Sequence, residues 1–344
     1  MNARRRLAAL LVALCGTFPL AANAALTAAS APAPALAASM PSGETSAISE
    51  ASAEALWRGD FDLLEQQYDA VRSSPDIVDG GALRLQWFRV GLARVFNAED
   101  EHDPYFAQLE ALTHDWTVAH PRSPLAQLLY ARALYARALD LRGTDYVSKT
   151  PAAAMQQFEH YLGLAEGQLA EHADVLRNES TTYVYQAMFG RWHLPFDRVH
   201  AIVLDGLKTN RRDLGGYEEL AMAALPRYGG STELFDAVVR EAIRRIDGYD
   251  GMALYAFLYD DYAGMFDGAL FSDSDVDWPT MRQGFRDYLA RYPDAYLLNR
   301  FALQACLAED KPTTLELLEQ IGAKPSQRAW GKRFDTCRHW ARSP

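Results

Sequence analysis

The sequence LAQLLYARALYARALDL, residues 125–141, decides how this chain folds. Apolar side chains surround it on nearly every side, whereas a helix at a protein surface carries them along one stripe. Alanines at positions 131, 133, 136 and 138 allow neighbouring helices to approach closely. The stretch therefore predicts a helix that is buried on several sides, as in the inner layer of a helical array.

Helical periodicity extends along most of the chain, from about Ile48 onward. Over residues 232–246 the apolar side chains recur at helical spacing, and Ser231 can cap the start of the helix. Over residues 278–292 the preceding Asp277 gives a second helix a similar start. About fourteen or fifteen helices are expected.

Helices joined by short connections predict hairpins that stack side by side. Residues 180–214 span one helix pair of ~34 residues, close to the tetratricopeptide period. Continuous helices are expected over 152–177 and 327–341, and no run alternates with period two for long enough to predict a sheet. The expected fold is all-α, a tetratricopeptide-like array of stacked helical hairpins (an α-solenoid).

The N-terminus has the three parts of a signal peptide. Arginines at positions 4–6 precede an apolar run that ends at Leu20, and Ala24 completes a small-residue cleavage site. A signal peptide over 1–24 predicts a periplasmic or secreted protein. Its removal takes three arginines away and changes the formal net charge from −11 to −14. So acidic a chain is repelled by nucleic acid and by anionic lipid heads, and we expect no nucleic-acid binding and no stable membrane insertion.

Three further segments follow the signal peptide. Residues 25–46 are rich in Ala, Pro and Ser, and we expect a disordered spacer. Residues 47–120 are expected to form N-terminal helical hairpins, and residues 121–342 a tetratricopeptide-like domain.

The clearest resemblance lies in three groups of residues. They are Arg142, Gly143 and Tyr146; the string Leu225, Pro226, Arg227, Tyr228, Gly229, Gly230 and Ser231; and Tyr292, Pro293, Asn299, Phe301, Ala302, Ala305, Cys306, Asp310, Ile321, Gly322 and Trp330. With them, residues 121–340 resemble the domain of unknown function 4034 family, although Tyr228 stands where that family more often has Trp. The resemblance implies a tetratricopeptide-like helical domain and no assigned reaction.

Motifs that mark catalysis are missing from the sequence. The eight histidines include no H-E-x-x-H, and there is no Walker loop, no G-x-G-x-x-G and no G-x-S-x-G. Asp273, Asp275 and Asp277 begin like a calcium loop, but Trp278 and Gly284 occupy the positions that need Gly and an acidic residue. A calcium site of another type and a helix-capping acidic turn both stay open. We expect no catalytic residue, cofactor or metal.

The segment from position 247 to position 277 holds eight aspartates and no Lys or Arg. Its candidate binding residues are Tyr255, Tyr259, Asp260, Asp261, Tyr262, Asp273, Asp275 and Asp277. An acidic, aromatic surface suits a basic peptide or a cationic ligand. The tyrosines also recur at helical spacing, which is equally typical of a buried core stripe.

A second group of candidates consists of Arg142, Tyr146, Arg227 and Tyr228, each of which follows a predicted helix end. Loops and inner helices line the binding surfaces of helical arrays. An arginine in this position can also serve only to satisfy the last carbonyl groups of its helix.

Two cysteines remain once Cys15 is removed with the signal peptide. An even number in an oxidising compartment favours a disulfide. We expect Cys306 and Cys337 to be bonded and to hold the C-terminal helix against the rest of the array.

The leading functional hypothesis is an exported scaffold that binds an envelope protein or peptide, without catalytic activity. The alternative is an envelope enzyme or small-ligand-binding protein that acts on glycan or peptide through an acidic, aromatic-rich pocket. A glycosidase would need two carboxylates about 5 to 9 Å apart.

Overall fold

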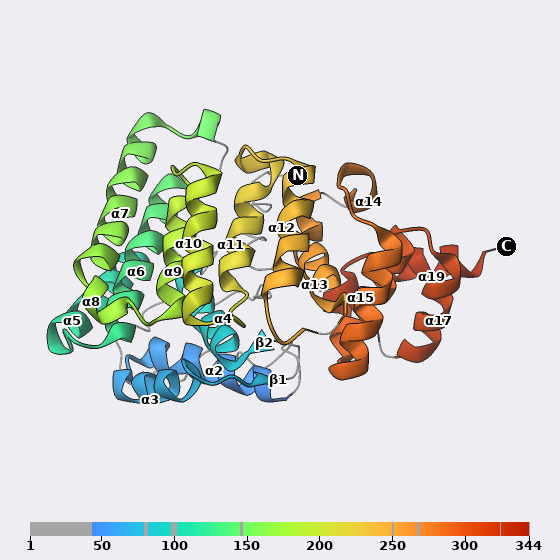
Figure 1. Ribbon diagram of the computed structural model, residues 1–344, viewed down its shortest axis with the longest axis horizontal. Helices are drawn as coiled ribbons and strands as arrows, with labels where there is room; N and C mark the ends of the chain where they lie inside the picture. Colours follow the sequence, from blue (N-terminus) through green and yellow to red (C-terminus); the bar gives the residue numbers. More distant parts are fainter. Residues whose placement is uncertain are drawn as a thin grey trace. The chain divides into compact units, whose positions relative to one another are not determined.

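The computed structural model describes residues 43–78, 82–97, 102–144, 147–249, 251–266, 269–323 and 325–343. Nearly all regular structure in these residues is helical, so the all-α prediction is confirmed (Figure 1). The exception is a two-stranded sheet of β1 (Ile77–Val78) and β2 (Ala82–Leu83). Among the described helices, none is long and apolar enough to cross a bilayer.

The contacts between residues divide the chain into two compact units. The described part of unit 1 comprises residues 46–76 and 83–220, and that of unit 2 is mainly residues 221–343. The helices that lie wholly or largely in unit 1 are α2 (Glu44–Arg58), α3 (Phe61–Val71), α4 (Arg84–Phe96), α5 (Tyr105–Ala119), α6 (Pro124–Arg142), α7 (Ala152–Glu171), α8 (Ala173–Leu176), α9 (Ser180–Gly190), α10 (Phe196–Thr209) and α11 (Gly215–Ala224), with the 3-10 turn η2 (Val147–Lys149). The boundary between the units falls inside α11, after Leu220.

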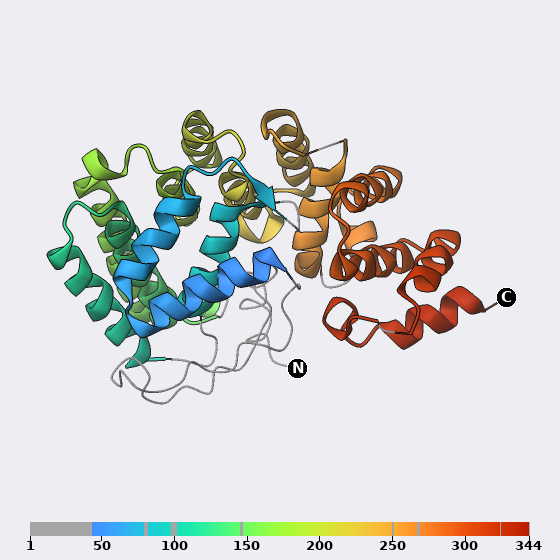
Figure 2. The same ribbon diagram turned by 90° about the horizontal axis from the view of Figure 1, so that it is seen from below.

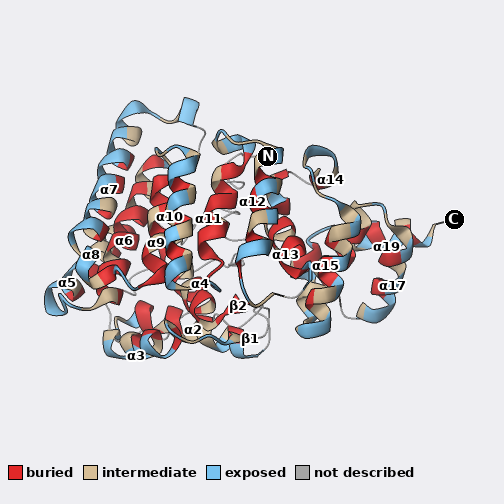
Figure 3. Cartoon of the chain, viewed as in Figure 1, coloured by how far each residue is buried: buried red, intermediate tan, exposed pale blue. Residues whose placement is uncertain are grey.

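Unit 1 is built around α6, the helix of the sequence quoted at the outset. Ser123 caps its N-terminus by accepting a hydrogen bond from the Ala126 amide, and Pro124 occupies the first turn. Helix α5, which precedes α6 in the sequence, and α7, which follows it, both pack against α6. Helix α9 packs against both α6 and α7. The predicted burial of this helix is confirmed, because almost every residue from Leu125 to Ala138 is inaccessible to solvent (Figure 3).

Unit 2 contains the remaining helices. They are α12 (Thr232–Arg245), α13 (Ala253–Tyr262), α14 (Leu270–Asp273), α15 (Trp278–Arg291), α16 (Ala295–Leu307), α17 (Lys311–Ile321), α18 (Gln327–Trp330) and α19 (Phe334–Arg342), with the 3-10 turns η3 (Pro226–Tyr228) and η4 (Ala263–Phe266). Helix α13 packs against α12 and α15, and α16 packs against α15, α17, α18 and α19 (Figure 2). Sequential helices thus pack as neighbours in each unit, while the solenoid arrangement and the tetratricopeptide likeness stay predictions.

Local sequence explains most helix starts in unit 2. Ser231 caps α12 by accepting from the Leu234 amide, as expected, and Asp277 caps α15 by accepting from the Thr280 amide. Asp294 and Asp310 do the same for α16 and α17. A short polar side chain at this position satisfies an amide that has no partner inside the helix.

Four expectations need correction. The helix expected over 152–177 ends at Glu171 and resumes as the single turn of α8. The helix expected over 327–341 is broken at Gly331, whose φ of 55° lies in the left-handed region that favours glycine. The short sheet formed by β1 and β2 was not predicted, because two-residue strands have no detectable alternation. Finally, α2 begins at Glu44, within the range assigned to the spacer.

A disulfide joins Cys306 of α16 to Cys337 of α19. The prediction from the two remaining cysteines is therefore confirmed. The signal peptide over 1–24 and the spacer up to residue 42 lie outside the described residues.

Candidate functional site

The three tyrosines of the predicted acidic, aromatic surface lie in the core of unit 2. Tyr255, Tyr259 and Tyr262 are 0%, 0% and 4% exposed, respectively. Tyr259 donates a hydrogen bond to Asp236 of α12 at 2.8 Å, and the Tyr255 hydroxyl accepts one from the Asp277 amide at 2.9 Å. The tyrosine stripe on α13 is thus a packing face, and it is not the binding surface that its composition suggested.

The two adjacent carboxylates of α13 have different environments. Asp260 accepts two hydrogen bonds from Arg300 of α16, at 2.9 and 2.8 Å, and a third from Gln304 at 2.7 Å. The carboxylate of Asp261 is half-buried and makes no hydrogen bond to another described residue. Burial and the neighbouring Asp260 raise the pKa of Asp261 to about 7, although Arg300 acts to lower it. Asp260 is therefore engaged in holding α13 to α16.

The aspartates before α15 cap and terminate helices. Asp277 accepts from both the amide and the hydroxyl of Thr280, and these hydrogen bonds lower its pKa. Asp273, in the last turn of α14, is exposed and accepts from the Ser272 hydroxyl, and Asp275 is exposed between the two helices. Among the described residues no group of three or more His, Cys, Asp or Glu side chains could hold a metal ion. Asp277 therefore has a structural role as the N-cap of α15.

The second group of candidates is divided between the units. Arg142 is 6% exposed, donates to the Gly143 carbonyl at 3.0 Å and lies 5.0 Å from the ring of Trp192. It therefore belongs to the core of unit 1, beside the C-terminal end of α6. Arg227 is exposed in unit 2, over the half-buried ring of Tyr228. Tyr146 lies outside the described residues.

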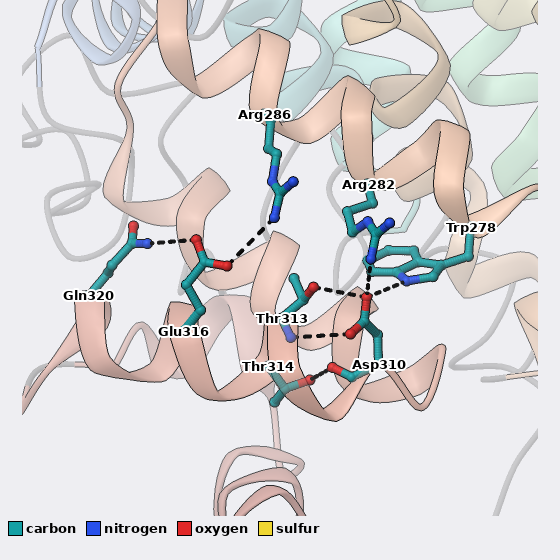
Figure 4. A network of polar contacts seen from close by, with 8 residues as sticks. All are labelled: Trp278, Arg282, Arg286, Asp310, Thr313, Thr314, Glu316 and Gln320. Carbon is teal, nitrogen blue, oxygen red and sulfur yellow. Dashed lines mark hydrogen bonds and ion pairs between the residues drawn. The ribbon is translucent and has the colours of Figure 1, made fainter.

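Asp310, one of the residues of the family resemblance, joins α15 to α17 (Figure 4). Its carboxylate accepts from the indole of Trp278 at 2.9 Å, from Arg282 at 2.8 Å and from the amide and hydroxyl of Thr313. Burial acts to raise the pKa of Asp310, but these hydrogen bonds more than offset it, so that the pKa is lowered. The contacts with Trp278 and Arg282 join α15 to α17, and those with Thr313 cap the start of α17.

A different surface stands out on unit 1. Between Leu125 and Ala138 of α6, every residue is buried except Tyr130 and Arg137. They are seven residues apart and therefore share one face of the helix. Helices α5 and α7 both pack on α6, and side chains from each of them border this accessible face.

Side chains from both flanking helices converge on this face. From α5, the His114 ring meets the Tyr130 ring edge-on at 5.2 Å, and Glu110 lies 3.3 Å from the Arg137 guanidinium. From α7, the ring of Tyr161 lies 5.3 Å from the same guanidinium. We refer to Glu110, His114, Tyr130, Arg137 and Tyr161 as the α6 strip.

Two exposed apolar side chains border the α6 strip. Val118 of α5 is 68% exposed and lies one helical turn beyond His114. Leu164 of α7 is 43% exposed, and it lies between Tyr161, which meets Arg137, and Gln168, which donates to Gln127 of α6. Leu164 therefore lies alongside the part of α6 that carries Tyr130. Aromatic side chains are enriched at protein interfaces, and Val118 and Leu164 add apolar surface at the border of the strip.

Burial has already changed the electrostatics of the strip. It raises the pKa of Glu110, with Arg137 acting in the opposite direction. It also raises the pKa of Tyr130, to which Glu110 and Tyr161 contribute by their charges. These groups are partly shielded from water before any partner arrives, so less hydration is lost when one binds.

No family model, curated protein or solved structure matches the chain. The functional interpretation therefore rests on the geometry of the described residues, and the resemblance to the domain of unknown function 4034 family stays a prediction.

Sequence reasoning missed the α6 strip for a physical reason. Arg132 and Arg137 are both arginines in the same apolar helix, yet Arg132 is 2% exposed and only Arg137 reaches the surface. A spacing of seven between Tyr130 and Arg137 indicates a shared face, but not that the face is accessible. Which side of an all-round apolar helix stays open depends on where its neighbours pack.

Proposed function

We propose that the protein is an exported helical interaction protein that binds an envelope protein or peptide through the α6 strip. The observation that carries this proposal is that Tyr130 and Arg137 are partly exposed on an otherwise buried helix, between two flanking helices. Tyrosine and arginine are among the residues that most often dominate binding energy at interfaces.

The composition of the strip supports a protein or peptide partner. Tyr130, Tyr161, Val118 and Leu164 supply an apolar and aromatic centre, and Glu110 and Arg137 supply charges that are already paired. A partner gains contact area there without the cost of burying an unpaired charge. Export is supported by the signal-peptide pattern of residues 1–24.

A photo-crosslinking amino acid placed at position 161 in cells, followed by capture and mass spectrometry, tests the proposal. We expect reproducible crosslinks to one envelope protein or peptide. The matched control is the same amino acid at Ala201, an exposed position of α10 in the same unit. Equal crosslinking from position 201 would contradict a specific site.

Substitutions then separate the α6 strip from the acidic segment. Tyr130→Ala with Tyr161→Ala should lower capture at least about tenfold, because truncation of an interface hot spot costs about 2 kcal/mol or more. Asp273→Asn with Asp275→Asn removes two exposed carboxylates of the acidic segment and should leave capture unchanged. If the Asp273 and Asp275 variant lost capture and the Tyr130 and Tyr161 variant kept it, the binding site would lie in the acidic segment. Thermal unfolding of each variant verifies that it is folded.

A further inference from the structure

The C-terminal end of unit 2 carries a concentration of positive charge in an acidic protein. Lys332 and Arg333 form the turn before α19, and Arg338, His339 and Arg342 lie on α19 itself. All five residues are exposed. The one carboxylate among residues 325–343 is Asp335, which pairs with Arg338 at 2.7 Å. We refer to these five basic residues as the basic end.

The basic side chains of α19 lie on one face of the helix. Positions 335, 338, 339 and 342 are spaced as one helix face, and the opposite face, with Cys337 and Ala341, is buried. Asp335 offsets the charge of Arg338, its partner three residues away, and the remaining positive charge comes from Arg342 on the same face and from Lys332 and Arg333 before the helix. The exposed face of α19 thus keeps a net positive charge.

The basic end is fastened to the rest of unit 2. The disulfide joins α19 to α16, and Lys311 of α17 donates to the carbonyl of Ser343. In α18, the Trp330 indole donates to Asn299 of α16 at 2.7 Å. The cations are therefore carried by a fixed surface, which lowers the entropy lost on binding.

We propose that the basic end binds the surface of a bilayer that contains anionic phospholipid. A single exposed helix face is convex, whereas extended peptides bind in grooves or along sheet edges, so the face suits a flat and wide array of negative charge. Trp340 and Phe334 are half-exposed at the margins of this face, and amphipathic aromatic rings favour the level of the lipid head groups.

The overall negative charge does not prevent this contact. At physiological salt, charges are screened beyond about 8 Å, so a bilayer near the basic end responds mainly to the charges located there. The expectation that anionic lipid heads repel the chain treats its charge as evenly spread, and the structure shows local positive charge on α19. Such a contact is peripheral and needs no membrane-spanning helix.

Vesicle co-sedimentation of the purified exported protein tests the proposal. We expect binding to phosphatidylcholine vesicles that contain phosphatidylglycerol, weak binding to phosphatidylcholine alone, and a loss of binding as salt is raised. Arg338→Gln with Arg342→Gln should weaken binding about tenfold to thirtyfold, since each cation near an anionic surface contributes to the affinity. Failure of the wild-type protein to distinguish the two vesicle types would overturn the proposal.

The matched control is Arg244→Gln with Arg245→Gln in the last turn of α12. Each pair holds one exposed arginine with a carboxylate partner on its own helix, Arg338 with Asp335 and Arg245 with Glu241, so both variants remove the same charge. The control should bind vesicles like the wild type, and equal weakening would show a general charge effect and refute a specific site.

Two further arms identify the source of any binding. Inorganic phosphate at matched ionic strength should not compete, and full competition would mean a phosphate site instead of a membrane surface. The Tyr161→Ala variant should keep vesicle binding, so this inference and the proposed function can fail separately. If the variant with Arg338→Gln and Arg342→Gln no longer crosslinked to a protein that the wild type captures but still bound vesicles, the partner of the basic end would be an acidic protein and not a lipid surface.

Discussion

Asp260 and Asp261 show how far two adjacent residues of the same type can differ. The first is held by Arg300 and Gln304, which follow 40 and 44 positions later, and the second has a pKa raised to about 7. The sequence predicted neither partner, because a distant ion pair leaves no local pattern. Ser231 and Asp277 were predicted as helix caps, since a cap bonds to an amide only three residues away.

Asp261 should make stability depend on pH. Its pKa in the folded protein is about 7, above the ordinary value of 3.8, so the native state holds this proton more tightly than the unfolded state does. Stability therefore falls as pH rises from about 4 to about 7. Asp261→Asn should raise the free energy of unfolding by about 1 to 3 kcal/mol at pH 8 and change it little near pH 4.

Urea unfolding at the two pH values measures this effect. Asp260→Asn serves as the comparison, because it weakens the pairing with Arg300 and should lower stability at both pH values. An equal gain from Asp261→Asn at pH 4 and pH 8 would show that the carboxylate is not strained by its burial.

At the scale of elements, two glycines show what helix packing requires. A Cβ atom at Gly91 of α4 would overlap Ser52 Oγ and the Ser49 carbonyl oxygen of α2, and Ser52 also donates to the Phe88 carbonyl at 3.1 Å. These two helices approach so closely that only glycine fits. At Gly163 of α7, the added atom would meet no heavy atom within 4 Å.

Alanine at the two positions should have opposite effects. Gly91→Ala should lower the free energy of unfolding by about 1 to 3 kcal/mol, because α2 and α4 must move apart. Gly163→Ala should raise it by about 0.5 to 1 kcal/mol, because glycine is a poor helix former. Thermal unfolding compares them directly, and a loss of stability from Gly163→Ala would reveal a contact that this face makes.

The disulfide should decide the stability of the C-terminal helices. It closes a loop between positions 31 residues apart, for which chain entropy predicts about 3 to 4 kcal/mol. Cys306→Ser with Cys337→Ser should lower stability by that amount and increase hydrogen exchange first in α19. If exchange in α19 stayed as slow as in the wild type, noncovalent packing would be sufficient to hold this helix.

At the scale of the whole molecule, charge is distributed unevenly. The formal net charge is −11, yet the surface of α19 is basic, and Asp273 and Asp275 are exposed in the same unit. Composition alone predicted repulsion from anionic surfaces. The position of each charge on the folded surface determines which partners it meets within a screening length.

Export is the prediction that belongs to the entire chain. The protein recovered from the periplasm should begin at Ala25, because Ala22, Asn23 and Ala24 form the cleavage site. N-terminal sequencing or intact mass spectrometry measures this directly. Arg4, Arg5 and Arg6 replaced by Gln should slow export and cause the uncleaved chain to accumulate, whereas recovery of an uncleaved wild-type chain would contradict the assignment.

The sequence by itself determined the all-α class, the buried core helix, several caps and the pairing of Cys306 with Cys337. These features follow from helical periodicity, from hydrogen bonds within a turn and from an even number of cysteines. Only the tertiary structure decided that the tyrosines of α13 face the core and that Tyr130 and Arg137 of α6 reach the surface. Accessibility depends on where neighbouring helices pack, and a residue's own helix does not encode that.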